Sequence, residues 1–382
     1  MEISTQLLQE KCKKILDAIG NKKGIAVDTV ELKVDGGTLY LSITDKEYYL
    51  SVPVSDINSE EYNDFRVVVE ADKFLKLVNK TTTSTINLKV SDNILFVKGN
   101  GSYKLPLIAD KDGNIIKLQK ITITNVTSAF PIKNAILQSI LKYNAKIFST
   151  SDGVSQYPFL YMDGQGAISI VRCACVNSFT LEQPVSLFLT EKLVKLFKLF
   201  KSEDVNFTLG FDELPNGILQ QKVCFSDGDA ELYAILTTDS QVVDKFPAAT
   251  LRNIATTVPP YTVVISKAAL VGALDRIALF KTAQDARYAQ TIRLTFEYEG
   301  VKVEDYSQNN SELVFYSEPC EAIGNEPEGK ENYSAMTNVD DLTSILNNCE
   351  DEFLTVSFGK GALYITKANI INLIPELKRR GN

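Results

Sequence analysis

The sequence predicts an α+β fold in which one unit, an amphipathic helix followed by short antiparallel strands, occurs six times. Apolar residues recur at helical spacing in six runs, and a strand pattern flanked by turn residues follows each run. The helical runs are 6–19, 71–80, 131–143, 190–201, 266–281 and 338–348. The strands that follow them are 35–43, 91–99, 163–171, 226–236, 298–304 and 359–366.

The strand segments carry the alternation expected of half-buried strands. Leu39, Leu41 and Ile43 alternate with polar or amphipathic neighbours, whereas the apolar run 94–99 indicates burial on both faces or an interface. Residues that tolerate positive φ mark the hairpins: Asp35-Gly36-Gly37, Ser91-Asp92-Asn93, Asp227-Gly228 and Gly359-Lys360-Gly361. We therefore expect antiparallel meanders with helices on one face. A ring with inner helices and outer sheets satisfies this repeat and leaves few exposed sheet edges.

Pairing the six units predicts three similar domains, each with two helix–antiparallel-sheet units. A connector over 115–126 and the Pro259-Pro260 pair place the boundaries near residues 122 and 257. The predicted domains are 1–122, 123–257 and 258–382. The Gly/Pro/Glu-rich insert 319–334 is expected to be a surface loop.

Composition argues against an enzyme. The chain of 382 residues has no histidine, which excludes Ser-His-Asp triads, histidine bases and histidine metal ligands. No GxGxxG or GxxxxGK[ST] motif is present, so we expect no cofactor. Among the six cysteines only Cys173 and Cys175 are close, and we expect buried thiols rather than a metal site or disulfides.

We expect a cytoplasmic protein. No apolar run approaches the 18 or so residues that cross a bilayer, and the first residues lack the apolar segment of a signal peptide. A reducing compartment agrees with the expected free thiols.

The net charge of −8 taken alone argues against a nucleic-acid partner, but its distribution indicates one. The six helical runs carry 15 basic and 7 acidic residues, so the remaining chain is strongly acidic. In run 190–201, Lys192, Lys195, Lys198 and Lys201 fan over one half of the helical wheel, opposite its leucines and phenylalanines. Basic helix faces in an acidic protein favour a polyanionic partner, although a solvated lysine face is the alternative. The run 338–348 has no Lys or Arg.

Several segments resemble the bacterial beta-type DNA polymerase sliding clamp, the DNA polymerase III beta subunit family. The segments 35–54 and 66–107 are similar to the two units of the family's first domain, and 263–280 to the helix that opens its third. Asp244-Lys245-Phe246-Pro247 and 373–377 resemble its second-to-third domain joint and its C-terminal segment.

The resemblance implies the DNA-clamp fold, a processivity factor, and two chains joined head-to-tail in a ring around double-stranded DNA. It implies three further partners: a replicative DNA polymerase, an ATP-driven clamp loader and a second copy of the chain, with no membrane. The run 172–177 and the ending ELKRRGN depart from the family pattern. This divergence indicates a phage-encoded clamp or a clamp with a private partner motif in a bacterial cytoplasm.

Two sets of site residues follow. The expected DNA contacts are the helix cations Lys11, Lys14, Lys73, Lys76, Lys133, Lys142, Lys195, Lys198 and Arg276. The resemblance places a partner-peptide pocket at Tyr157, Arg172, Ala174, Pro247, Leu251 and Ile374. An enclosing ring needs only weak phosphate contacts without sequence information, which lysine provides.

Two alternatives remain open. A non-enzymatic structural or assembly protein could use the same β-rich repeats in open assemblies, without a need for basic helices. An enzyme could use paired carboxylates such as Glu60-Glu61 or Glu350-Asp351-Glu352, but these lie in acidic runs typical of solvated surface.

Overall fold

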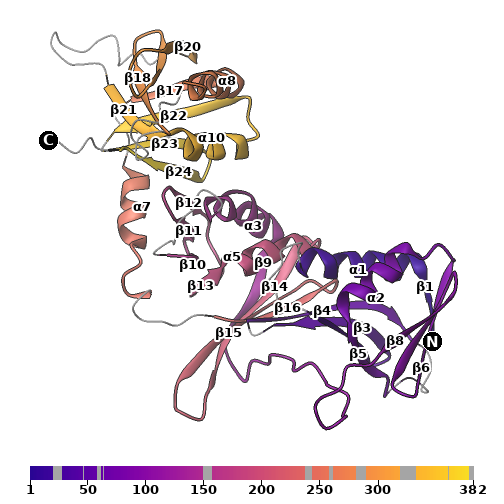
Figure 1. Cartoon of the computed structure of the whole chain (residues 1–382). Helices are drawn as coiled ribbons and strands as arrows, with labels where there is room; N and C mark the ends of the chain where they lie inside the picture. Colours follow the sequence, from indigo (N-terminus) through magenta and orange to yellow (C-terminus); the bar gives the residue numbers. More distant parts are fainter. Residues whose placement is uncertain are drawn as a thin grey trace. The chain divides into compact units, whose positions relative to one another are not determined.

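The structure of the protein is a computed structural model, and it describes residues 1–19, 28–45, 47–57, 62, 64–148, 157–236, 243–257, 261–280, 290–318, 333–359 and 361–377. The chain forms two compact units (Figure 1). Unit 1 contains Met1–Leu137 and Lys195–Thr238, and unit 2 contains Gln138–Val194 and Asp239–Asn382. Both units consist of antiparallel sheets with helices, which confirms the α+β prediction.

Unit 1 contains an eight-stranded and a four-stranded antiparallel sheet. The order of the larger is β5 (Arg66–Glu70), β2 (Thr29–Asp35), β3 (Thr38–Thr44), β4 (Tyr48–Asp56), β16 (Glu231–Ile235), β15 (Leu219–Ser226), β14 (Asp204–Glu213), β9 (Asn125–Lys133). The order of the smaller is β1 (Glu2–Ser4), β6 (Thr85–Ser91), β7 (Ile94–Lys98), β8 (Ser102–Pro106).

Unit 2 contains one twelve-stranded sheet. Its first eight strands are β13 (Ser186–Thr190), β10 (Phe159–Asp163), β11 (Gly166–Ile170), β12 (Ala174–Ser178), β24 (Ile370–Pro375), β23 (Ala362–Lys367), β22 (Phe353–Gly359), β17 (Tyr261–Ser266). The last four are β20 (Ser311–Glu318), β19 (Gly300–Asp305), β18 (Thr291–Phe296), β21 (Tyr333–Asn338).

All six helical runs contain a helix, and the apolar face of each packs on a sheet or another helix. The main helices are α1 (Thr5–Ile19), α2 (Ala71–Lys80), α3 (Asn134–Ser139), α5 (Glu191–Leu196), α8 (Lys267–Ala278) and α10 (Val339–Asn348). In α2, Phe74, Leu75 and Val78 are fully buried, whereas its lysines are exposed. In unit 2, α8 and α10 contribute Leu274 and Ile345 to one core cluster.

The helices in two of the runs, 131–143 and 190–201, differ most from the predicted bounds. The run 131–143 begins as strand, because β9 pairs with β14 through Lys133 opposite Asp204, and α3 starts only at Asn134. After α3 a short π-helix, η2 (Ile140–Asn144), and a short α-helix, α4 (Ala145–Ile147), continue the segment. The run 190–201 is also shorter than predicted, since α5 ends in the 3₁₀ turn η4 (Phe197–Leu199).

The helix α7 (Ala248–Thr256) was not predicted. It lies in the segment that the sequence indicated only as a domain joint. Its Ala-Ala-Thr start and single turn of buried residues, Leu251 and Ala255, give a short apolar stripe that is weak as a helix signal.

The repeat is visible in the topology of the two units. Read across the sheet, β5-β2-β3-β4-β16-β15-β14-β9 in unit 1 corresponds strand by strand to β13-β10-β11-β12-β24-β23-β22-β17 in unit 2. The pairs β4–β16 and β12–β24 join strands from both sides of a predicted domain boundary. Within each unit, the sheet therefore continues from one predicted domain into the next. The three-domain division itself stays a prediction, and most of the insert 319–334 lies outside the described residues.

Candidate functional site

The predicted cations on α1 are largely buried. Lys11 Nζ lies 2.9 Å from Asp229 Oδ1, and Lys14 Nζ lies 3.2 Å from Asp229 Oδ2. The two lysine side chains are only 10% and 14% exposed. The hydrogen bond from Lys11 and the nearby charge of Lys14 hold the pKa of Asp229 below its ordinary value. Both lysines therefore link α1 to the β15–β16 turn, which leaves little of them accessible to a ligand.

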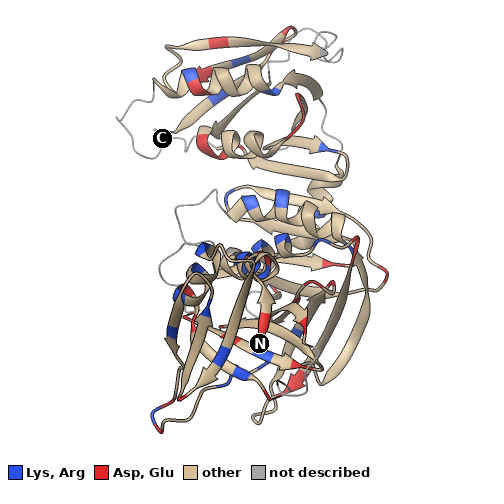
Figure 2. Cartoon of the chain, turned by 90° about the vertical axis from the view of Figure 1, so that its right-hand side faces the viewer, with Lys and Arg blue, Asp and Glu red and all other residues tan. Residues whose placement is uncertain are grey.

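The cations on α2 and α5 lie on exposed helix faces. Lys73 and Lys76 have nearly two thirds of their side chains exposed and pair with acidic residues of the same segment, Glu70 at 2.6 Å and Asp72 at 2.8 Å. Lys195 is exposed on α5, and Lys198 is exposed on the following turn η4. Figure 2 shows Lys and Arg positions along several helices and Asp and Glu positions on strands, turns and some helices.

The remaining predicted cations pair with carboxylates from other elements. Lys133, the last residue of β9, lies 2.9 Å from Asp204, and this contact raises the pKa of Lys133. Lys142 on η2 pairs with Glu350. The Arg276 guanidinium on α8 binds the Glu312 carboxylate with two hydrogen bonds, one from Nε at 2.8 Å.

These ion pairs determine how strongly the basic helix faces attract an anion. An exposed ion pair contributes about 1 kcal/mol or less, so a phosphate can replace the carboxylate at Lys73, Lys76 or Lys133 at little cost. The acidic partners also cancel most of the local positive charge. The helices therefore offer weak, exchangeable anion contacts rather than a strongly basic patch.

The predicted partner pocket falls on one face of the β10–β12, β23 and β24 region of unit 2. We call this the α7 surface. It consists of a buried cluster with partly buried neighbours that include Tyr161, Ile170, Phe246, Ile254 and Ile371. The buried members are Ile168, Ala174, Val176, Leu251, Ala255, Tyr364 and Leu373.

An aromatic group borders this surface. The Phe246 ring lies 5.3 Å from the rings of Tyr157 and Tyr161 and 5.5 Å from that of Phe188, measured between centroids. The Tyr157 hydroxyl also donates to the Lys245 carbonyl at 2.9 Å. Partly exposed aromatic rings with polar edges are typical of surfaces that anchor a partner's side chains.

An ion pair fastens α7 to the sheet. Arg252 Nη1 donates to Asp163 Oδ2 at 2.7 Å, and Nη2 donates to Asp163 Oδ1. Burial alone would raise the pKa of Asp163, but the hydrogen bonds from Arg252 and from the Gln165 amide outweigh it and lower that pKa. This bidentate contact fixes the helix that forms one side of the α7 surface.

The structure brings together four of the six predicted pocket residues. Ala174 and Leu251 share the buried cluster, Pro247 precedes α7 directly, and Tyr157 packs on Phe246 beside it. The other two lie elsewhere. Ile374 belongs to the core cluster under α8 and α10, because neighbouring residues of a strand face opposite sides and Leu373 takes the α7 side. Arg172 instead lies 3.6 Å from Asp341 of α10.

Sequence reasoning missed several residues of this surface, above all Phe188, Arg252 and Asp163. Two signals were available. Leu251, Ile254 and Ala255 have the i, i+3, i+4 spacing of a helix face, and strand alternation pairs Ile371 with Leu373 rather than with Ile374. The Arg252–Asp163 contact joins residues 89 positions apart and had no local signal.

Two of the carboxylates named for the enzyme alternative form ion pairs. Glu350 and Asp351 pair with Lys142 and Lys367, and Glu60-Glu61 lies outside the described residues. Within the described ranges no three metal-binding side chains gather, and the five cysteines found there are buried free thiols. No helix among the described residues has the length and apolar character needed to cross a bilayer.

Comparisons with known proteins agree on the fold. No family model matches the chain, and no curated protein matches it. Solved structures do. A sliding clamp (DNA polymerase III subunit beta) from Pseudomonas aeruginosa bound to griselimycin has a TM-score of 0.75 at 15% identity, with 99% of both chains covered.

Two further clamps give the same result. The DNA polymerase III beta subunit of Thermotoga maritima has a TM-score of 0.74 at 14% identity over 99% of both chains. The sliding clamp of Bacillus subtilis has a TM-score of 0.75 at 13% identity, covering 99% of this chain and 98% of that one. From end to end, this chain has the fold of the bacterial DNA polymerase sliding clamps.

Proposed function

We propose that the protein is a sliding clamp, a non-enzymatic processivity factor that encircles duplex DNA and tethers a replicative DNA polymerase in a bacterial cytoplasm. The observation that carries the proposal is the likeness to solved clamps over 99% of both chains. Three domains, 1–122, 123–257 and 258–382, would form half of a two-chain ring. A clamp-loader ATPase would open and close it.

The exposed helix cations would face the DNA. Lys73, Lys76, Lys195 and Lys198 are the most accessible of the nine predicted contacts, whereas Lys11 and Lys14 serve chiefly the α1 link to Asp229. Their weak, exchangeable contacts suit a protein that must slide. Binding by charge alone would be lost with rising salt, but an intact ring stays on circular DNA.

Ring closure would use apolar groups that each unit leaves exposed. In unit 2, Leu279 and Phe280 follow α8 with 80% and 49% exposure, and Phe315 on β20 is 63% exposed. In unit 1, β8 is the last strand of the four-stranded sheet and carries the exposed Tyr103. An unpaired strand edge and exposed apolar side chains support a head-to-tail contact between two copies.

The α7 surface would dock the polymerase and the loader through short peptides. Its apolar cluster and the rings around Phe246 supply anchoring contacts for apolar peptide side chains. The assembly-protein alternative gains no support from the likeness to clamps.

Retention on DNA tests the proposal. After loading by the source's own loader, the protein should remain on nicked circular DNA in high salt and be lost from the same DNA once linearised. Equal loss from both would contradict enclosure. Solution mass should correspond to two chains, and a monomer or open polymer would contradict the dimeric ring.

The basic faces can be tested by charge reversal. Lys195→Glu combined with Lys198→Glu should leave folding intact, because both side chains are exposed, and should lower primer-extension processivity several-fold. Lys89→Glu with Lys98→Glu, the same charge change on exposed strand positions, is the matched control. Unchanged processivity in the first variant would count against these contacts.

A further inference from the structure

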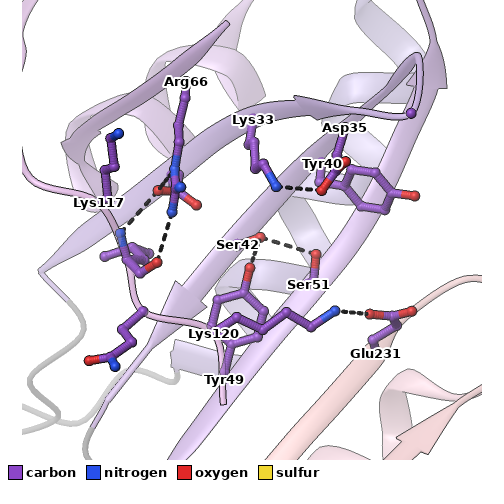
Figure 3. A pocket seen from close by; sticks show the side chains of 14 residues that line it. Lys33, Asp35, Tyr40, Ser42, Tyr49, Ser51, Arg66, Lys117, Lys120 and Glu231 are labelled. Carbon is purple, nitrogen blue, oxygen red and sulfur yellow. Dashed lines mark hydrogen bonds and ion pairs between the residues drawn. The ribbon is translucent and has the colours of Figure 1, made fainter. Parts of the chain in front are cut away.

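Unit 1 contains a polar trough on one face of its eight-stranded sheet. The segment 117–120 passes over strands β2 to β5, and side chains of the segment and the strands line a hollow beside it (Figure 3). The hollow has a volume of about 770 Å³. Its lining residues come from β2, β3, β4, β5, β16 and the segment itself. Neither the predicted DNA contacts nor the predicted partner pocket includes any of them.

The trough occupies the position in unit 1 that the α7 surface occupies in unit 2. Glu70 is the last strand residue before α2, and Thr190 is the last strand residue before α5, so the two are equivalent positions of the repeat. From these two positions, the paired residues of adjacent strands can be followed across each sheet. They define one row of four side chains in unit 1 and an equivalent row of four in unit 2. The row in unit 1 is Glu31, Ser42, Ser51 and Glu231. The row in unit 2 is Tyr161, Ile168, Val176 and Ile371.

The two rows have opposite chemistry. Every member of the unit 2 row belongs to the apolar α7 surface, and every member of the unit 1 row lines the trough. A carboxylate, two hydroxyls and a second carboxylate thus replace four apolar side chains. All four positions of the unit 1 row are therefore polar, and the row offers no apolar surface to which an apolar peptide could bind.

The floor of the trough is fixed by buried hydrogen bonds. Glu31, 1% exposed, accepts from Arg66 Nε at 2.7 Å and from the Leu118 amide at 3.0 Å through one oxygen. Arg66 Nη2 also donates to the Leu118 carbonyl at 2.9 Å, which holds the segment 117–120 against the sheet. Ser42 and Ser51 share a hydrogen bond, and the Tyr49 hydroxyl donates to Ser42. A floor of this kind is formed before any ligand arrives.

The accessible charges of the trough favour an anion. Four cations line it, Lys33, Arg66, Lys117 and Lys120, against three carboxylates, of which Glu31 is buried. Lys33 and Lys120 have exposed pairs with Asp35 and Glu231, which a ligand carboxylate can replace. Lys117 is exposed, and among the described residues no carboxylate lies within ion-pair distance of it. The local excess is positive in a chain whose net charge is −8.

The volume of the trough and its two exposed carboxylates indicate which class of anion it can bind. The volume is far larger than a single phosphate requires and is in the range that holds a short peptide segment. Asp35 and Glu231 at the rim would repel the closely spaced charges of a nucleic-acid backbone. A peptide with carboxylates separated by small polar residues can instead place each carboxylate on a cation.

We propose that the trough is a second docking site, distinct from the α7 surface, which binds an extended acidic peptide segment of a partner protein. Lys117 and Lys120 receive its carboxylates, and Arg66 and Lys33 form the opposite wall. The site does not depend on the clamp function, so the two can fail separately.

Binding of a labelled peptide tests the site. A fluorescein-labelled decamer of alternating Asp and Ser should bind the full chain at low salt and raise its fluorescence anisotropy, whereas the Lys-Ser decamer should not. Lys117→Glu with Lys120→Glu should weaken binding at least tenfold. Glu231→Gln, which removes a competing carboxylate, should strengthen binding about twofold. Both lysines are exposed and the Glu231 side chain is 40% exposed, so both changes should leave the fold intact.

Controls separate the site from general charge. Lys89→Glu with Lys98→Glu should change the dissociation constant less than twofold. Equal weakening by both double variants, or no binding of the acidic decamer, would overturn the proposal. Displacement of the decamer by an equal concentration of a single-stranded DNA decamer would overturn the assignment to peptide. Retention of the Lys117→Glu, Lys120→Glu variant on circular DNA should equal that of the unchanged protein.

Discussion

In each unit, one strand pair joins the sheet across a predicted domain boundary: β4–β16 in unit 1 and β12–β24 in unit 2. These two sheet joints have the same strand order, but different segments of the chain cover them. At the β12–β24 joint of unit 2, the helix α7 covers an apolar row and is fastened by Arg252 to Asp163. At the β4–β16 joint of unit 1, an extended segment crosses a polar row and is fastened by Arg66, which binds both Glu31 and the Leu118 carbonyl.

The difference shows that a repeated backbone does not repeat its surface chemistry. Strand pairing is made by main-chain groups and tolerates either kind of side chain on the outward face. The outward row is therefore free to diverge. At both joints, an arginine–carboxylate contact holds the covering segment on the sheet.

The largest effect is expected from removal of these arginines. Arg66→Ala should lower the free energy of unfolding by about 3 kcal/mol, since it leaves the Glu31 carboxylate buried and without its cation. Arg252→Ala should cost about 2 kcal/mol, because the Asp163 side chain is 14% exposed and keeps a hydrogen bond from the Gln165 amide. Urea unfolding measures both.

Lys33→Ala is the control for that comparison. Lys33 pairs with the exposed Asp35 on the same sheet face as Arg66, so its loss should change stability by about 0.5 kcal/mol or less. An Arg66→Ala variant as stable as Lys33→Ala would show that the buried contact does not hold the segment.

A somewhat smaller loss of stability is expected when an apolar side chain is truncated in either covering segment, α7 or 117–120. Leu251→Ala on α7 should cost about 2 kcal/mol, because it removes a side chain from a buried cluster of seven residues. Leu118→Ala should cost about 1 kcal/mol, since its cluster has just two other buried members among the described residues, Tyr49 and Val68. Thermal unfolding of the two variants would measure the difference. Equal losses would mean that the two coverings are packed alike.

The smallest effect concerns pH. The folded-state pKa of Asp163 lies below its unfolded value of 3.8, so its contribution to stability is present above that value and is lost as the pH falls through the folded pKa. Asp163→Asn should therefore be less stable than the unchanged protein at pH 6, and the gap should narrow below about pH 3.8. Unfolding in urea at pH 6, 4 and 3 measures it.

Asp35 at the trough provides the contrast. Its pKa is also lowered, by the hydrogen bond from Lys33, but its side chain is 63% exposed. Water and salt screen an exposed pair, so Asp35→Asn should show a weaker dependence of stability on pH than Asp163→Asn. A stronger dependence at Asp35 would contradict the ranking by burial.

Much of the fold could be predicted from the sequence because its signals are local. The run 71–80 coincides with α2, and the strands after the helices were found from two-residue alternation and from turns such as Asp35-Gly36-Gly37. The bounds of α3 and α5 were wrong where strand pairing or a 3₁₀ turn, neither visible in periodicity, ended the pattern. Of the six residues predicted for a partner pocket, the structure places Tyr157, Ala174, Pro247 and Leu251 together, and their role in binding stays a prediction.

The sequence by itself determined the repeat, the helix faces and the charge of each segment, since these depend on residues a few positions apart. Only the tertiary structure decided that Lys11 and Lys14 are taken up by Asp229, that Ile374 faces the core, and that Glu31, Ser42, Ser51 and Glu231 form one polar row. These contacts join residues as many as 218 positions apart. They depend on which strands pair and in which register, and a one-residue shift of register would turn every side chain to the opposite face.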